Sequence, residues 1–354
     1  LNDDYKTKYI NNTYKQKEFY VSTAQQYSPL SFWDIAVSAD YQYNTLDADL
    51  PLFAYPERNT ELVALATSIH FKKFKFQTSI LGTFVQEKIK EASLSSKSPD
   101  KEEYTPAVFV NYKPFNMLDL TFHAFYKRIF RMPTFNDLYY TEIGSSQLKP
   151  EYTTQYDIGF NYNKDFTSGF LKNINLVADV YYNEVTDKII AYPRGQQFRW
   201  TMINLGKARI RGIDVSAQSS WLLTRDLLLN LRATYTYEDA QDLTSSKLSY
   251  YKDQIPYIPW NSGSLLLGMA YKDWNLNYSF IYTGERYTMQ ANIPENYEKK
   301  WYTQDLSLSK EISLNTFKIK AGIEVNNLFD KQYTIVQNYP MPGRNYRVSL
   351  RFIL

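Results

Sequence analysis

The sequence predicts an all-β fold, built from about fifteen long antiparallel strands without a helix. Three observations predict it. The 354 residues include 33 Tyr and 21 Phe but only 12 Gly. Aromatic residues are enriched in β-strands and glycine is depleted there. Apolar and polar residues alternate through segments of ~10–15 residues, whereas strands of soluble sheets usually have about five or six. The connections between these segments also alternate, because every second one is short and the others are mostly long.

Period-two alternation and turn residues place each strand in order. Short turns with charged residues, Pro or Gly separate the strands at one end, as at Lys72-Lys73, Pro114 and Lys272-Asp273. Polar loops separate them at the other end, the longest near residues 46–59, 90–102, 131–151, 239–259, 284–300 and 327–343. The predicted strands are residues 14–27, 31–45, 60–71, 75–89, 103–112, 118–130, 152–163, 173–192, 198–220, 226–238, 260–271, 274–283, 301–310, 316–326 and 344–354.

Several strands separate their two faces cleanly. In residues 226–238, Leu227, Leu229 and Leu231 share one face, and Asn230 and Arg232 share the other. A barrel with lipid outside and water inside requires this pattern. A soluble antiparallel sheet can show it too, so alternation alone does not decide between them.

Loop lengths and tryptophans favour the barrel. Short periplasmic turns and long extracellular loops are typical of outer-membrane barrels, which also carry two aromatic belts. Tryptophans flank the short turns at three positions and begin strands after loops at three others, namely Trp33, Trp221 and Trp274, and Trp200, Trp260 and Trp301. No run approaches the ~18 apolar residues of a membrane helix. We therefore predict a transmembrane antiparallel β-barrel.

Three motifs follow one another in residues 130–160, here called the signature segment. They are F-R-M-P-T-F from Phe130, L-K-P-E from Leu148 and Y-D-I-G-F from Tyr156. The segment resembles the signature loop of TonB-dependent outer-membrane receptors. Later motifs resemble the same family: N-L-G-K-A from Asn204, R-G-I-D-V from Arg211, N-L-F-D-K-Q-Y from Asn327, and the final strand. The family usually ends in an aromatic residue, whereas this chain ends in Leu354, two residues after Phe352.

The resemblance implies an incomplete barrel. A full receptor has about 22 strands and an N-terminal plug domain that binds TonB. Residues 1–354 are therefore expected to be a single domain, the C-terminal portion of that barrel, with the plug and about seven strands outside this sequence. Strand parity then places residues 1–13 on the extracellular side. The polar start, without a signal peptide, suits a mature or internal piece in a Gram-negative outer membrane.

The composition argues against enzymatic and cofactor chemistry. There is no Cys, which removes thiolate metal sites, disulfides and thiol catalysis. The only histidines, His70 and His123, lie in strands without metal-ligand spacing, so we expect no metal and no cofactor. His123, on a polar strand face, is the sole candidate for the Ser–His pair of a barrel esterase. A net charge of +3 is too small to indicate nucleic-acid binding.

The family resemblance implies active import of a scarce chelate, energised through TonB and the plug. Tyr and Arg in the extracellular loops could stack on and hydrogen-bond to a large chelate. The candidate ligand-binding residues are Arg131, Tyr139, Tyr140, Arg194, Gln197, Arg286, Tyr287, Gln290 and Tyr339. The residues expected to fix the signature segment are Phe130, Pro133, Phe135, Leu148, Lys149, Pro150 and Glu151, with Arg131 also pairing within the loop.

The substrate class stays open between an iron–siderophore and cobalamin. Haem is disfavoured, because haem receptors of the family carry a loop histidine and N-P-N-L, where this chain has Ser146-Gln147-Leu148. The expected partners are the missing plug and strands, the TonB complex, lipid, lipopolysaccharide, the small chelate and a surface lipoprotein. The alternative is a non-transporting outer-membrane barrel, either an adhesion or assembly protein or a barrel esterase.

Overall fold

The computed structural model describes residues 12–90, 97–140, 144–193, 200–314 and 316–353. These residues form one antiparallel sheet of fifteen strands with two small hairpins beside it. The predicted fold class and strand number are confirmed. Among the described residues, no helix is long and apolar enough to cross a lipid bilayer.

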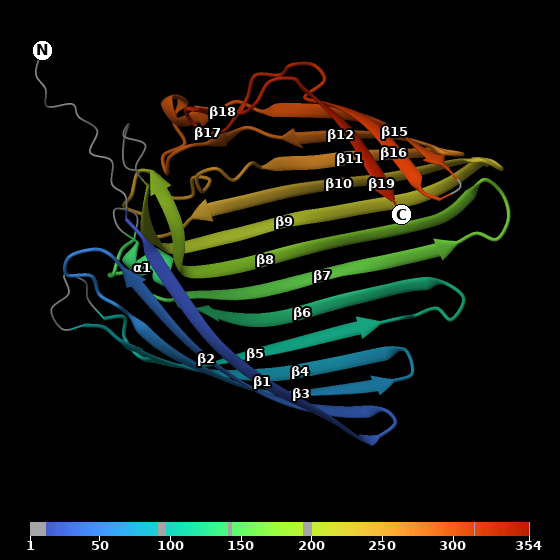
Figure 1. Cartoon of the computed structure of the whole chain (residues 1–354). Helices are drawn as coiled ribbons and strands as arrows, with labels where there is room; N and C mark the ends of the chain where they lie inside the picture. Colours follow the sequence, from blue (N-terminus) through green and yellow to red (C-terminus); the bar gives the residue numbers. More distant parts are fainter. Residues whose placement is uncertain (1–11, 91–96, 141–143, 194–199, 315, 354) are drawn as a thin grey trace, which may run out of the picture.

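The strands of the large sheet follow one another in chain order (Figure 1). They are β1 (Tyr14–Leu30), β2 (Trp33–Ala48), β3 (Glu57–Phe71), β4 (Phe74–Lys88), β5 (Lys101–Tyr112), β6 (Asp119–Arg131), β7 (Glu151–Asp165), β8 (Leu171–Pro193), β9 (Trp200–Thr224), β10 (Leu227–Asp242), β11 (Asn261–Tyr271), β12 (Trp274–Thr283), β15 (Trp301–Ser313), β16 (Lys318–Asn326) and β19 (Asn345–Ile353). Every neighbouring pair is antiparallel, so the sheet is a continuous series of hairpins.

The predicted alternation of connections is also confirmed. Short turns follow β1, β3, β5, β7, β9, β11 and β15, and long connections follow β2, β4, β6, β10, β12 and β16. The connection after β8 contains residues 194–199, which lie outside the described residues. Because successive strands run in opposite directions, all the long connections gather at one end of the sheet, here called the loop end.

The two faces of the sheet differ in chemistry. Cross-strand pairing aligns Ile158 with Val180 and Val180 with Ile213, and these side chains are 63%, 51% and 43% exposed. Such a row of exposed β-branched residues suits contact with lipid. On the opposite face, pairing aligns His123 with Gly159, Gly159 with Asp179 and Asp179 with Asp214. This polar face is called the lumen face.

The loops contain local structure that the sequence interpretation missed. The signature segment holds a one-turn helix, α1 (Phe135–Tyr139), where a continuous loop was predicted. The predicted loops 284–300 and 327–343 contain the hairpins β13 (Arg286–Tyr287) with β14 (Tyr297–Glu298) and β17 (Thr334–Val336) with β18 (Tyr339–Pro340), and a 3-10 turn, η2 (Pro294–Asn296). Elements this short contain too few residues to show a periodic sequence pattern. They are held by capping and by contacts between loops.

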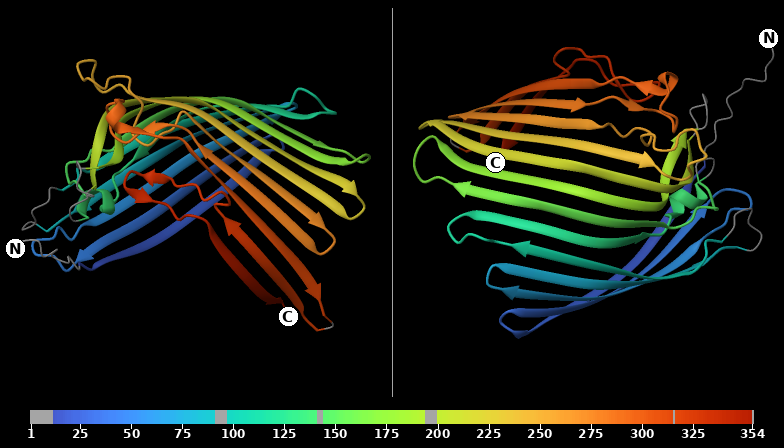
Figure 2. Two further views of the ribbon diagram at one scale, coloured as in Figure 1. Left: turned by 90° about the horizontal axis from the view of Figure 1, so that it is seen from above. Right: turned by 180° about the vertical axis from the view of Figure 1, so that it is seen from behind.

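The strand series does not close on itself. Within the described residues, β1 pairs only with β2 and β19 only with β16. Figure 2 shows the sheet curved into a trough, with the blue first strand and the red last strand along its two edges. In hydrocarbon, unpaired peptide groups have no water to bind. We therefore propose that further strands, outside this chain, pair with both edges.

Residues 1–354 expressed alone should not form a stable barrel. The two edges expose on the order of ten unpaired peptide groups, and each costs several kcal/mol in lipid. We expect aggregation or degradation, with a heat-modifiable and protease-resistant barrel only on co-expression with a segment that supplies the proposed further strands. Semi-native gel electrophoresis and trypsin digestion of outer membranes measure both properties. A closed monomeric barrel from residues 1–354 alone would contradict this prediction.

Candidate functional site

A buried ion pair anchors the start of the signature segment. Arg58 at the beginning of β3 donates from Nε and Nη2 to Oε2 of Glu87 at the end of β4, at 2.8 and 2.5 Å. Its Nη1 donates to the carbonyl oxygen of Pro133 at 2.8 Å, and its guanidinium lies 4.8 Å from the ring centre of Phe135. One cation therefore joins two strands to the loop that crosses them.

The helix α1 brings a third group to this ion pair. Thr134 caps the helix: its Oγ accepts from the backbone N–H of Asp137, and its own N–H donates to Asp137 Oδ2. This reciprocal capping fixes the first turn. Tyr139 then donates its hydroxyl to Oε1 of Glu87. Burial and the neighbouring Glu87 raise the pKa of the Tyr139 phenol, so Tyr139 remains a donor.

A second set of contacts joins the start of the signature segment to its L-K-P-E motif. Arg131 Nη2 donates to Asp137 Oδ2 at 3.1 Å, and its Nη1 lies 3.6 Å from Glu151 Oε2. The same Glu151 oxygen accepts the backbone N–H of Ile189 on β8. The pairing of Arg131 within the loop, which the sequence interpretation expected, is present.

A side chain from another motif holds the L-K-P-E part. Asn204 on β9 accepts the N–H of Lys149 at 2.8 Å and donates to the Lys149 carbonyl at 3.0 Å. Its amide also donates to the carbonyl of Asp187 at 2.7 Å. The N-L-G-K-A motif therefore supports the signature segment, so the two sequence motifs serve one structure. Both motifs are visible in the sequence, but the contact between them depends on the fold.

The apolar residues expected to fix this segment line its interior. Pro133, Phe135, Leu148 and Pro150 are buried, while Phe130 packs against Tyr152 with ring centres 5.5 Å apart. The loop-end core around them contains Leu46, Ala48, Phe53, Ala54, Phe135, Leu138, Tyr139, Leu148 and Ile189. The signature segment is therefore packed over the lumen face of β2 and β8 rather than projecting into solvent.

Several predicted ligand-binding residues have internal roles. Tyr139 is 5% exposed. Arg286 is 2% exposed and donates from Nη2 to the carbonyls of Thr334 and Ile335, and burial lowers the pKa of its guanidinium. Neither side chain could reach a ligand without a rearrangement of the loops. Tyr140 stacks on Tyr14 with ring centres 4.3 Å apart.

The other candidates are exposed, half-buried or outside the described residues. Tyr339 is 48% exposed on β18, while Tyr287 is half-buried between the rings of Trp260 and Tyr297. Gln290 is half-buried, and its amide lies 3.5 Å from Asp242. Arg194 and Gln197 lie outside the described residues. The structure therefore brings Tyr287 and Gln290 together on one loop and places Tyr339 on another.

The long loops after β10 and β12 are fixed and joined by two side-chain amides that sequence reasoning missed. Gln254 is 2% exposed; its side chain accepts from the N–H of Ala240 and donates to the carbonyl of Glu238. Asn292 accepts the N–H of Gln254 and donates to its carbonyl. With Arg286 bound to the loop after β16, three successive loops form one packed unit.

The histidines correct one expectation. His123 was the only histidine considered for a Ser–His pair, but the serine lies beside His70. Ser68 Oγ and Asp34 Oδ2 are each 3.1 Å from His70, and both approach the same ring atom, Nε2. A catalytic triad needs the carboxylate on the other ring nitrogen. The described part of the chain therefore gives neither histidine the geometry of a serine hydrolase.

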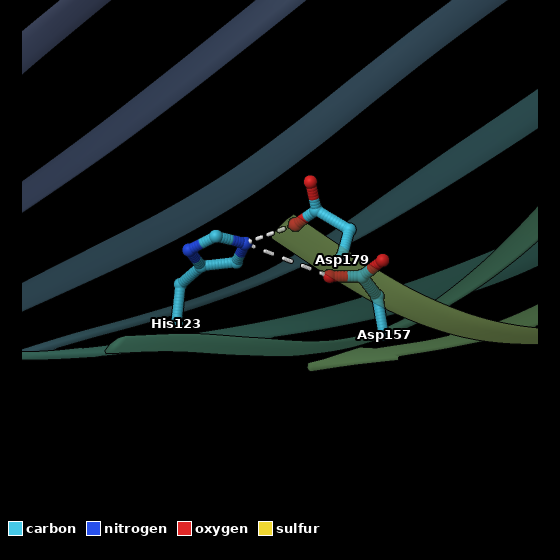
Figure 3. Close-up of side chains that lie close together, drawn as sticks. All are labelled: His123, Asp157 and Asp179. Atoms are coloured by element: carbon cyan, nitrogen blue, oxygen red, sulfur yellow. Dashed lines mark hydrogen bonds and ion pairs between the residues drawn. The ribbon is translucent and has the colours of Figure 1, made fainter. Parts of the chain in front are cut away.

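The sequence interpretation also missed a cluster on the lumen face. Nε2 of His123 on β6 lies 2.6 Å from Asp179 Oδ1 on β8 and 3.7 Å from Asp157 Oδ1 on β7 (Figure 3). These three donor atoms lie within 4.8 Å of one another, which is close enough for one metal ion. A signal existed in the sequence, since Asp157 belongs to Y-D-I-G-F and His123 lies on a polar face.

Replacing Arg58 with Met should destabilise the protein far more than replacing Arg131 with Met. Arg58→Met leaves Glu87 buried without its cation, a loss of about 3–5 kcal/mol. Arg131 is the matched control: it also forms ion pairs, with Asp137 and Glu151, but its side chain is 43% exposed, and exposed pairs are worth about 1 kcal/mol or less. Urea unfolding of the complete receptor in lipid vesicles measures both. Equal losses would show that the Arg58–Glu87 pair is not the anchor.

The chain resembles known proteins in sequence. Residues 1–328 match the family model described as TonB dependent receptor-like, beta-barrel. The chain is 29% identical over 233 residues to the vitamin B12 transporter BtuB of Photobacterium profundum, covering 63% of this chain and 34% of that protein. It is 25% identical over 234 residues to BtuB of Vibrio vulnificus. The match thus spans about a third of each curated relative (34% and 33%).

The fold resembles solved structures over nearly its whole length. The copper transporter OprC superposes with a TM-score of 0.72 and 16% identity, covering 97% of this chain and 57% of that one. The ferric citrate transporter FecA gives 0.70 and 15%, covering 97% and 55%. Such structures show the fold, and the family consists of multi-pass barrels of the Gram-negative outer membrane. With strand order, signature segment and sequence match in agreement, the chain belongs to the TonB-dependent receptor family as part of its outer-membrane β-barrel.

Proposed function

We propose that this chain is part of a receptor that imports a scarce metal chelate or cobalamin across the outer membrane. The observation that carries the proposal is the match of residues 1–328 to the barrel of TonB-dependent receptors. In this proposal the energy comes from the TonB complex, acting through a plug domain encoded outside residues 1–354. Residues 1–354 would themselves provide the wall of the pathway and most of its extracellular loops.

The packing of the loop end supports a binding role. A loop that is already ordered loses less conformational entropy when a ligand binds. The contacts of Gln254 with Asn292, and of Arg286 with the Thr334 and Ile335 carbonyls, order the loops in advance. Tyr287 packs edge-on against Trp260 and Tyr297, and Tyr339 is exposed beside this group of loops. Large chelates offer flat apolar surfaces that such rings can contact.

The substrate proposal keeps two classes, an iron–siderophore and cobalamin. Sequence relatives are named vitamin B12 transporters, whereas neighbours in structure are named for copper, ferric citrate and ferric preacinetobactin. The candidate residues that are at least partly exposed are the uncharged Tyr140, Tyr287, Gln290 and Tyr339, together with Arg131, whose charge is paired with Asp137 and Glu151, so this set suits either class. The further partners proposed are lipid and lipopolysaccharide around the apolar face, and a surface lipoprotein over the loop end.

An esterase function is disfavoured by the histidine geometry. Ser68 and Asp34 compete for one nitrogen of His70, and His123 faces carboxylates. Neither arrangement can activate a serine by the usual relay of serine, histidine and carboxylate. We therefore infer a transport function rather than catalysis.

Uptake in whole cells tests the proposal. A strain that lacks the complete receptor should lose high-affinity uptake of either radiolabelled cobalamin or one ferric siderophore, and the intact gene should restore it. The substrate that is lost also decides between the two classes. Normal uptake of cobalamin and of every ferric siderophore supplied would contradict the proposal.

Tyr339→Ala should weaken ligand binding by roughly two- to tenfold, because an aromatic contact is worth about 0.5–1.5 kcal/mol. Tyr271→Ala is the matched control: Tyr271 is 45% exposed against 48% for Tyr339, but it adjoins the short turn after β11 at the opposite end of the sheet. Binding of the labelled substrate to whole cells at 4 °C measures the effect without transport. Equal binding by the two variants would remove Tyr339 from the ligand site.

A further inference from the structure

Three neighbouring strands place donor atoms at one point on the lumen face. His123 comes from β6, Asp157 from β7 and Asp179 from β8, and all three side chains converge in Figure 3. The point lies away from the strand ends, remote from the loop end and its candidate ligand residues. Backbone pairing fixes the strands on which the donors stand, so no loop needs to move to assemble them.

Gly159 makes room for the cluster. It lies between His123 and Asp179 in the cross-strand row. A Cβ atom at this position would be 2.3 Å from Asp179 Oδ1 and 2.7 Å from His123 Nε2. Any side chain at residue 159 would therefore occupy the space in which the donor atoms meet. The glycine of the Y-D-I-G-F motif is needed for this close approach, rather than for a turn.

The negative charge of the cluster is not balanced among the described residues. Asp157 has a side chain only 10% exposed, and its Oδ1 atom points at His123 but accepts no hydrogen bond within the described part of the chain. Oδ1 of Asp214, on the neighbouring strand β9, is also buried without a hydrogen-bond partner there. One imidazole, carrying at most one positive charge, thus faces the two carboxylates of Asp157 and Asp179, and the third carboxylate, Asp214, lies opposite Asp179 on the next strand. Keeping such buried carboxylates ionised is costly unless a cation pairs with them.

We propose that His123, Asp157 and Asp179 bind a divalent first-row transition-metal ion of the Zn²⁺ type. An imidazole nitrogen with two carboxylate oxygens is a donor set that suits such ions, whereas Ca²⁺ and Mg²⁺ prefer oxygen alone. Zinc lies about 2.0–2.2 Å from each donor in tetrahedral geometry, which places the donor atoms about 3.4 Å apart. The observed separations of 2.6 and 3.7 Å bracket that value. Bound there, the ion links β6, β7 and β8 across the barrel wall.

Zinc titration of the complete, detergent-purified receptor tests this site, independently of any transport substrate. After chelator treatment, the receptor should take up one equivalent of Zn²⁺ from ZnCl₂, and MgCl₂ or CaCl₂ should not compete. Asp179→Asn and His123→Gln should each weaken binding by more than about tenfold, since even the outer partners of metal ligands contribute ~10–100-fold. His70→Gln is the matched control, because it removes the other histidine on the lumen face and should leave the stoichiometry unchanged.

Two further readouts separate loss of the site from loss of the fold. Heat-modifiable migration on gels shows whether each variant is a closed barrel, and Zn²⁺ should raise the unfolding temperature of the unaltered protein and of His70→Gln only. X-ray absorption at the zinc edge of the unaltered protein should show a single imidazole with oxygen ligands. The proposal is overturned if the unaltered receptor binds no zinc. That result is expected if a basic side chain of another segment neutralises the carboxylates of the cluster. It is equally overturned if the absorption spectrum shows no imidazole, or if His70→Gln removes the zinc.

Discussion

The pairing of backbone hydrogen bonds is the constraint on which this structure depends. A chain surrounded by hydrocarbon has no water to satisfy its peptide groups, so each strand must pair on both sides. The chain meets this requirement by connecting every strand to the next in sequence, which gives fifteen strands in simple order. The same requirement applies to β1 and β19, whose outer edges are unpaired in the described residues, and it is the reason for our proposal that further strands pair with both edges.

Simple strand order has a second consequence, because it sends alternate connections to opposite ends. The short turns need little support, but the long loops must satisfy their own polar groups without a sheet. They do so through a few buried and half-buried side chains. Arg58 and Glu87 hold the signature segment, Asn204 holds its second half, and the Asn292 amide joins the loop after β12 to the backbone of Gln254 in the loop after β10. The loop end is therefore a packed layer of protein.

The lumen face shows how a barrel wall can carry buried charge. Two strand glycines lie where large polar groups meet: Gly159 beside His123 and Asp179, and Gly212, where a Cβ atom would be 2.5 Å from the Tyr181 hydroxyl. That hydroxyl donates to Glu238 at 3.1 Å. Glycine weakens a strand, so its presence twice in this region has a packing reason. At each position a polar side chain thus lies over the glycine of a neighbouring strand, where no side chain blocks it, instead of extending into the lumen.

The sequence by itself determined the strands, their order, their faces and the family, because period-two alternation and turn residues are local signals and because the motifs are contiguous. It predicted that Phe135, Leu148 and Glu151 fix the signature segment, but it did not predict α1, whose single turn depends on the Thr134 cap. Only the tertiary structure decided which side chains meet. Arg58 and Glu87 are 29 residues apart, and His123 and Asp179 are 56 apart. Their contact depends on strand register, and alternation reveals the face of a residue but not its neighbours across the sheet.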